Sequence, residues 1–84
     1  MNSDEIIDRG IRFYEENIRP KIEAENRGKF LVINVESGEY EIDVDDVAAA
    51  RRAKNRFPGA PLFSMRVGSP VAYRLGIISF DLRS

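Results

Sequence analysis

The sequence contains no cysteine, no histidine and no tryptophan. Without cysteine, neither a disulfide nor a thiolate metal site can stabilise the fold. Without histidine the chain lacks the commonest general base and the commonest metal ligand, and without tryptophan it lacks the best surface for stacking on bases. We therefore expect a protein that is not an enzyme and that holds no metal ion and no cofactor.

An excess of one charge and long hydrophobic runs are also missing. Thirteen Lys and Arg residues stand against 14 Asp and Glu residues, a net charge of -1, which argues against nucleic-acid binding by bulk electrostatics. No stretch approaches the roughly 18 apolar residues of a membrane-spanning helix, and the charged start MNSDEIID does not resemble a signal peptide. The composition therefore predicts a soluble cytoplasmic protein without membrane contact.

The short chain predicts a single domain over residues 1–84 with a thin core. A domain of this size buries only roughly 60% of the surface that its unfolded chain exposes. Association with a second subunit or a partner protein would add buried surface, so we expect a dimer or a two-protein complex.

Apolar residues at spacings of three and four predict an amphipathic helix over residues 3–27, ended by Gly28 in a left-handed conformation. The stripe consists of Ile7, Ile11, Tyr14, Ile18 and Ile22. Pro20 lacks the N–H that the helix ladder needs, so the sequence predicts either a kink near residues 16–20 or a break into two helices. The stripe continues in phase past Pro20, which favours the kink.

Two β-rich runs, residues 30–35 and 39–44, predict a hairpin closed by the three-residue loop 36–38 with Gly38 at positive φ. This loop places Val32 opposite Ile42 and thereby fixes every other pair. One face of the hairpin is then apolar on both strands. It carries Phe30, Val32, Tyr40, Ile42 and Val44.

The other face of the predicted hairpin is apolar on the first strand only. Leu31, Ile33 and Val35 lie there beside acidic residues of the second strand. Three aligned apolar side chains left in water favour association. We therefore predict that Leu31, Ile33 and Val35 form an interaction surface, covered by the N-terminal helix or by a second subunit.

Residues 43–56 predict a second helix with Asp43 or Asp45 as its cap. Its expected inward face is Val47, Ala50, Ala53 and Phe57. Its second half carries four basic side chains, Arg51, Arg52, Lys54 and Arg56. These are candidates for nucleic-acid contact, although cations at a helix C-terminus also complement the helix dipole.

An acidic cluster surrounds the start of the same helix and consists of Glu39, Glu41, Asp43, Asp45 and Asp46. Such a cluster could bind Mg²⁺ or Ca²⁺, but helix starts collect acids for electrostatic reasons, and alternating acids on a strand are typical of a solvated edge. The simpler interpretation predicts no metal site. No serine, tyrosine or lysine lies in a recognisable catalytic arrangement.

The remaining segments complete an α+β pattern. Residues 62–67 predict a third strand, residues 69–76 a short helix or a tight turn, and residues 77–82 a final strand or a terminal arm. The order of helix, hairpin, helix, strand, short helix or turn and final strand predicts a small antiparallel or mixed sheet with helices packed on it.

Four motifs give the sequence a resemblance over about residues 9–76. They are Tyr14-Glu15-Glu16, Gly28-Lys29-Phe30, Ser37-Gly38-Glu39-Tyr40 and Arg66-Val67-Gly68. In these motifs the chain resembles a family of small, uncharacterised bacterial proteins, largely cyanobacterial. The resemblance implies an α+β fold and a binding role, and it implies no catalytic activity.

The sequence thus predicts a non-catalytic protein–protein interaction module. The alternative belongs to another class: an antitoxin-like or regulatory nucleic-acid-binding protein, in which a dimer would bring two copies of the basic helix end onto one face.

Overall fold

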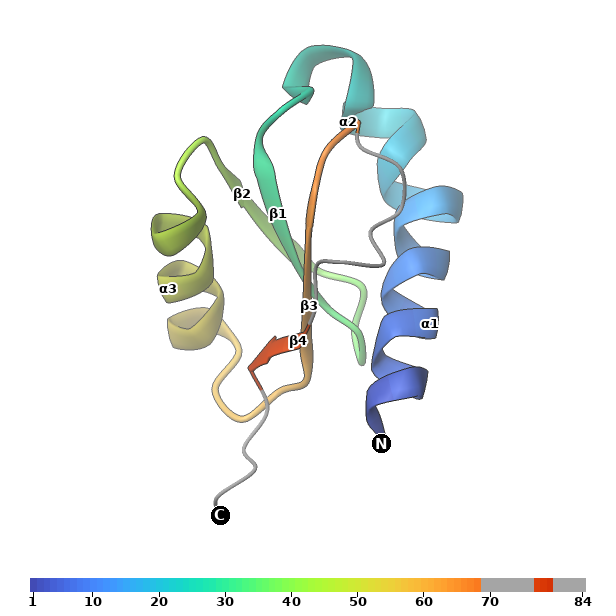
Figure 1. Ribbon diagram of the computed structural model, residues 1–84, viewed down its shortest axis with the longest axis vertical. Helices are drawn as coiled ribbons and strands as arrows, with labels where there is room; N and C mark the ends of the chain where they lie inside the picture. The colour runs from blue at the N-terminus through green and yellow to red at the C-terminus, as the bar shows by residue number, and fades with distance from the viewer. Residues whose placement is uncertain (69–76, 80–84) are drawn as a thin grey trace.

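A four-stranded antiparallel sheet lies between two helical layers in the computed structural model, which describes residues 1–68 and 77–79 (Figure 1). Its strands are β1 (Phe30–Asn34), β2 (Tyr40–Asp43), β3 (Leu62–Arg66) and β4 (Ile77–Ser79), in the spatial order β2-β1-β3-β4. The predicted α+β class is confirmed, and the sheet is antiparallel throughout. The short helix or turn predicted at residues 69–76 and the end of the final strand lie outside the described residues.

The N-terminal layer is one helical run made of α1 (Ser3–Phe13), a π-helical turn η1 (Tyr14–Ile18) and α2 (Arg19–Asn26). Asn2 caps its start, because the Asn2 side chain accepts a hydrogen bond from the backbone N–H of Glu5 at 2.9 Å and the Glu5 carboxylate accepts one from the N–H of Asn2 at 3.1 Å. Within the described residues, no helix combines the length and apolar character needed to cross a bilayer.

The π-helical turn accommodates Pro20 within the helical run. The N–H of Arg19 donates to the carbonyl of Tyr14, five residues back, where an α-helix would reach four residues back. This wider turn places Pro20 at the start of α2, where its missing N–H costs little. The run stays helical through the predicted kink region and then changes direction, so that α2 crosses toward β1 (Figure 1).

The hairpin register differs from the sequence prediction by one residue. Leu31 lies opposite Ile42, and Val32 lies opposite Glu41. The loop is therefore one residue longer than predicted: the N–H of Asn34 donates to the carbonyl of Glu39 at 2.8 Å. Neighbouring residues of a strand face opposite sides of a sheet, so a shift of one residue changes which side chains share a face. Ile42 now lies on the same face as Leu31, and Glu41 on the same face as Val32.

Asn34 is the cause of the longer loop. Its side-chain oxygen accepts hydrogen bonds from the backbone N–H groups of Glu36 and Ser37 at 2.9 and 3.4 Å, which starts the turn one residue early. Val35 then pairs with the other neighbour, since its N–H donates to the carbonyl of Pro61 at 3.2 Å. Gly38 has a φ of 84°, as predicted.

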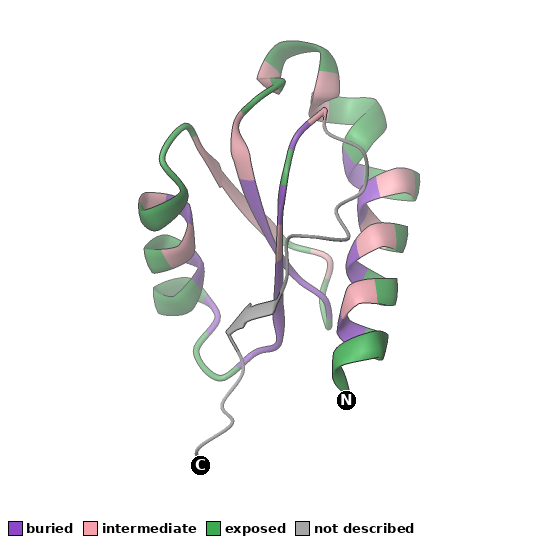
Figure 2. Ribbon diagram, viewed as in Figure 1, coloured by how far each residue is buried: buried purple, intermediate pink, exposed green. Residues whose placement is uncertain are grey.

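The sheet separates two apolar clusters (Figure 2). The larger cluster lies under the N-terminal helix and joins Ile6, Tyr14 and Ile18 to Phe63 and other residues of β1 and β3. Leu31, Ile33 and Val35 belong to it and are each 0% exposed. The N-terminal helix, the first of the two predicted covers, therefore covers this row, and as buried core the row offers no interaction surface on the folded chain.

Gly10 sets the close approach of α1 to the sheet. A Cβ placed on Gly10 would lie 2.4 Å from Cδ2 and 2.7 Å from Cβ of Phe63, which is itself fully buried. Only a residue without a side chain fits at this contact.

The smaller cluster lies under α3 (Asp46–Arg56), which Asp45 caps by accepting a hydrogen bond from the N–H of Val47 at 3.0 Å. Ala49 and Ala53 are its buried positions, whereas Val47 is 57% exposed. The predicted inward face of Val47, Ala50, Ala53 and Phe57 is therefore wrong at its first two members: the helix is rotated so that Ala49 packs against the sheet.

Candidate functional site

The structure divides the four basic residues of α3 into two pairs. Arg52 and Arg56 reach over the edge strand β2 and bind the carboxylates of this strand and of Glu39, which precedes it. The guanidinium of Arg52 lies 3.0 Å from Oε1 of Glu41 and 2.7 Å from Oδ2 of Asp43. The guanidinium of Arg56 lies 2.8 Å from Oε2 of Glu41 and 3.4 Å from Oε2 of Glu39.

The same two arginines close the free edge of the sheet. Arg52 donates to the carbonyl of Ile42 at 2.8 Å and Arg56 donates to the carbonyl of Tyr40 at 3.2 Å. Tyr40 and Ile42 alternate with the residues that bond β1, so these carbonyls point away from the sheet. Because the guanidinium groups occupy them, this edge is protected against pairing with another strand.

These ion pairs change the interpretation of the acidic cluster. Hydrogen bonds from Arg56 and Arg52 lower the pKa of Glu41, and the hydrogen bond from Arg52 lowers the pKa of Asp43. The acids of β2 are thus partners of α3, where a merely solvated edge was predicted. Among the described residues, no group of acidic side chains is arranged to hold a metal ion.

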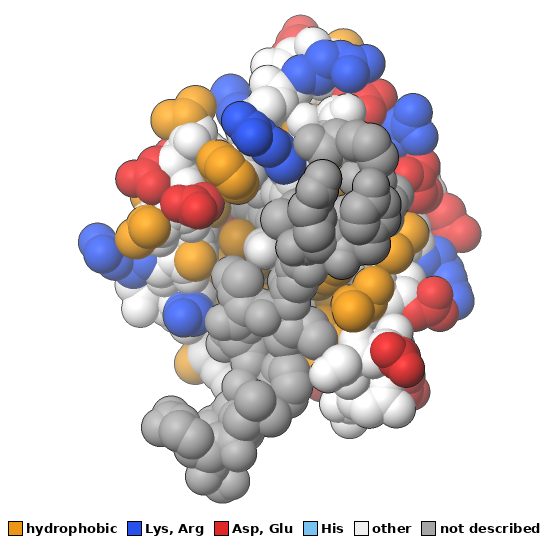
Figure 3. Space-filling model, viewed as in Figure 1, with side chains coloured by type: hydrophobic (Ala, Val, Ile, Leu, Met, Phe, Trp, Pro, Cys, Tyr) orange, Lys and Arg blue, Asp and Glu red, His pale blue; other side chains and the backbone are white. Residues whose placement is uncertain are grey.

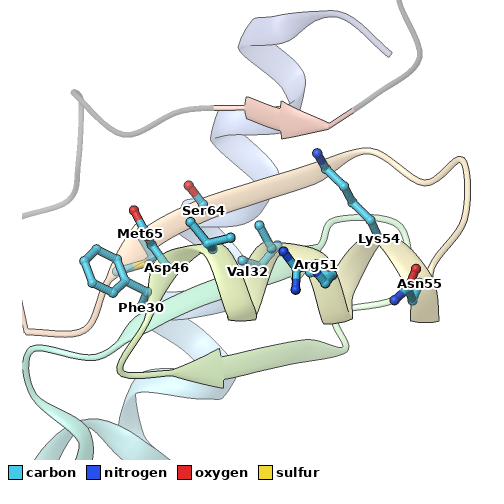
Figure 4. Close-up of a pocket in the computed structure, with 10 residues that line it drawn as sticks. Phe30, Val32, Asp46, Arg51, Lys54, Asn55, Ser64 and Met65 are labelled. Atoms are coloured by element: carbon cyan, nitrogen blue, oxygen red, sulfur yellow. The ribbon is translucent and has the colours of Figure 1, made fainter.

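Arg51 and Lys54 have a different environment, because they line a groove of about 480 Å³ beside α3 (Figure 4). The other lining residues of α3 are Asp46, Val47, Ala50 and Asn55, and those of the sheet are Phe30, Val32, Ser64 and Met65. In the part of the chain that the structure describes, neither Arg51 nor Lys54 forms an ion pair. The groove is thus bordered by two cations that form no ion pair with a described residue, and by the acid Asp46 at the start of α3.

The groove lies beside the strands on which α3 mainly packs. These strands are β1 and β2, and α3 also covers Leu62 at the start of β3. A helix is about 10 Å wide and strands lie about 4.8 Å apart, so one helix covers two strands. The groove lies on the β3 side of α3, where Ser64 and Met65 line it.

Apolar surface is exposed at the start of α3. Val44 is 72% exposed and Val47 is 57% exposed, and in the described part of the chain the other large hydrophobic residue exposed to this degree is Met1. Hydrophobic, basic and acidic side chains lie next to one another on this side of the molecule (Figure 3, left). Sequence reasoning missed this surface because it placed Val47 in the core.

Phe30 forms the apolar end of the groove, and the guanidinium of Arg66 packs over its ring. The guanidinium of Arg66 lies 5.1 Å from the centre of the Phe30 ring and donates to the carbonyl of Gly28 at 3.2 Å. Arg66 pairs with Phe30 across β1 and β3, which places both side chains on the α3 face of the sheet. Phe30 remains partly exposed in this position.

A second hollow, of about 290 Å³, lies between the N-terminal helix and the hairpin loop. Arg9 and Arg12 line it, but so do Glu16 and Glu36, and Arg12 already pairs with Asp8 at 3.3 Å. Its charges are therefore balanced within the hollow, and it does not select a ligand of either sign.

Tyr14 is a core residue, as expected from its place in the apolar stripe. It is 2% exposed, and its hydroxyl accepts a hydrogen bond from the N–H of Gly68 at 3.4 Å. Burial raises the pKa of this hydroxyl, so the group stays protonated and serves as a link between the N-terminal helix and the end of β3.

The sequence matches no protein-family model, and no curated protein or solved structure matches it significantly. The resemblance to small bacterial proteins therefore stays a prediction.

Proposed function

We propose that this chain is a cytoplasmic, non-catalytic protein-interaction module, active as a homodimer or as one half of a two-protein complex, and that its docking face is the groove beside α3. The observation that supports the proposal is the exposure of Val47 at the border of this groove. An apolar residue in the first turn of a helix normally packs on the sheet beneath it, and here it faces outward.

The protected edge of β2 also supports the groove beside α3 as the docking face. Arg52 and Arg56 block the outer carbonyls of β2, which disfavours docking of a partner strand at that edge. The apolar row of β1 is covered by the N-terminal helix. Of the described surfaces, the groove thus combines accessible apolar residues with a concave shape.

Site-specific photo-crosslinking tests the proposal. A photoreactive amino acid replaces Val47 in one variant and exposed Lys21 of α2 in a control variant, and both are irradiated in extracts of cells that naturally contain the protein, with and without nuclease. We expect a discrete protein adduct at position 47, unaffected by nuclease and absent at position 21. Equal labelling at both positions, or no adduct at position 47, would contradict the proposal.

The alternative, an antitoxin-like or regulatory nucleic-acid-binding protein, requires the basic residues of α3 to contact phosphates. Arg52 and Arg56 would first have to leave the carboxylates of β2. Arg51 and Lys54 alone give few phosphate contacts, and binding that depends on so few is weak and salt-sensitive. We expect fluorescence anisotropy on random-sequence duplexes to show no binding tighter than about 1 μM at physiological salt. Tighter binding that Arg51→Glu abolishes would favour the alternative.

A further inference from the structure

We propose that the groove beside α3 binds an acidic amphipathic helix of a partner protein. This inference rests on the proposed function and names the chemistry of the partner. Two features of the groove carry it: its excess of cations and its length.

Charge selects an acidic partner. Four cations lie on α3, and the fold neutralises two of them, Arg52 and Arg56, with the acids of β2. Arg51 and Lys54 form no ion pair with a described residue and border the groove. Asp46 also lines the groove, so its described lining holds two cations and one anion. This excess of positive charge favours carboxylates in the occupant, since complementary charge raises the association rate and suppresses wrong partners.

The length of the groove fits a helix. The groove follows α3 from Asp46 to Asn55, which corresponds to about 14 Å or about two and a half helical turns. Opposite α3 the described lining comes from β1 and β3, at Phe30, Val32 and Ser64. A partner helix placed there would lie alongside α3, with its apolar face toward Phe30, Val47 and Ala50.

A second copy of this chain is a poorer occupant. The N-terminal helix turns its apolar stripe toward its own sheet, and α3 turns Ala49 and Ala53 the same way. α3 exposes Val47, but on the same helix lie Arg51 and Lys54, so docking of α3 into the groove of another copy would bring the cations of both copies together. Like charges across an interface disfavour binding. A different protein that supplies the helix fits better, which selects the two-protein complex over the homodimer.

Selection from a displayed library of amphipathic helices, about five turns long and with the charged positions randomised to Glu, Lys or Gln, tests the inference. Selection uses the wild-type protein. We expect the recovered peptides to be rich in Glu and poor in Lys, and to bind Arg51→Glu/Lys54→Glu about tenfold more weakly than wild type. The neutral variant Arg51→Gln/Lys54→Gln should give an intermediate affinity.

The matched control is Arg9→Glu/Lys21→Glu, which changes the net charge equally but on the N-terminal helix. It should bind the selected peptides within about twofold of wild type, as expected for distant surface charges in physiological salt. Circular dichroism and thermal unfolding establish that all variants are folded.

Four results would overturn the inference. The first is recovery of peptides without a charge bias, or of none above background. The second is equal weakening by the control variant. The third is submicromolar binding of random-sequence nucleic acid that Arg51→Glu/Lys54→Glu abolishes. The fourth is self-association in sedimentation that Val47→Asp relieves. If photo-crosslinking at position 47 captures a protein but the library selects no acidic helices, the proposed function stands and this inference fails.

Discussion

The contact between α1 and β3 predicts that Gly10→Ala destabilises the fold, although alanine favours helices. On an open helix surface this change adds about 1 kcal/mol of stability. Here the new methyl group would lie 2.4 to 2.7 Å from three atoms of Phe63, one of them the Cβ, which cannot move without the backbone. Overpacking of a buried site costs about 1 to 3 kcal/mol, and this close contact indicates the upper end.

The net loss in the free energy of unfolding should therefore be about 2 kcal/mol, or roughly a 10 °C lower melting temperature for a domain of this size. Urea unfolding followed by circular dichroism measures it. The matched control is Ala24→Gly on the exposed side of α2, which should cost about 1 kcal/mol through helix propensity alone. If Gly10→Ala is as stable as wild type or more stable, α1 does not pack against Phe63 as described.

Three further changes test other parts of the fold. Gly38→Val should lower the free energy of unfolding by more than about 1 kcal/mol, because Gly38 has a φ of 84° and a Cβ there would lie 2.8 Å from the ring of Phe13; an unchanged melting temperature contradicts this. Asn34→Ala should cost about 1 kcal/mol by removing the acceptor of two loop N–H groups, whereas Asn34→Asp keeps the acceptor and should cost less in the same thermal unfolding measurement. Arg52→Gln/Arg56→Gln should lower stability at neutral pH. The paired carboxyl groups of β2 have lowered pKa values in the folded state. Their contribution to the free energy of unfolding is therefore complete above their ordinary pKa values of about 4 and is lost as the pH falls through the lower folded values. The difference in stability between wild type and variant should shrink in that pH range, and a difference independent of pH refutes the ion pairs.

The sequence predicted the elements well because their signals are local. The apolar stripe of the N-terminal helix, the β-rich runs at residues 30–35 and 62–67, and Gly38 at positive φ each depend on neighbouring residues only. The third strand also shows the predicted alternation, with Phe63 packed under the N-terminal helix and Leu62 under α3. These features fixed the α+β class without reference to distant contacts.

The candidate site was not predictable in the same way, because it depends on how elements meet. Asn34 has a side chain that starts the loop one residue early, and this hydrogen bonding shifts the register so that Tyr40 and Ile42 share the face of Leu31. The alanines of α3 allow this helix to pack on the sheet in several orientations about its own axis. The pairing of Arg52 with the acids of β2 favours the orientation in which Val47 is exposed. Both outcomes follow from contacts between residues far apart in sequence.

Backbone amide chemical-shift mapping with the partner recovered by crosslinking at Val47 tests the central claim most directly. The account predicts that shift changes concentrate around the groove, at Val32, Val47, Arg51, Lys54 and Ser64. The outer face of the N-terminal helix, on the opposite side of the sheet, should not respond (Figure 1). Shift changes confined to that helix or to the hairpin loop, with the groove residues unaffected, would contradict the claim that the groove beside α3 is the docking face.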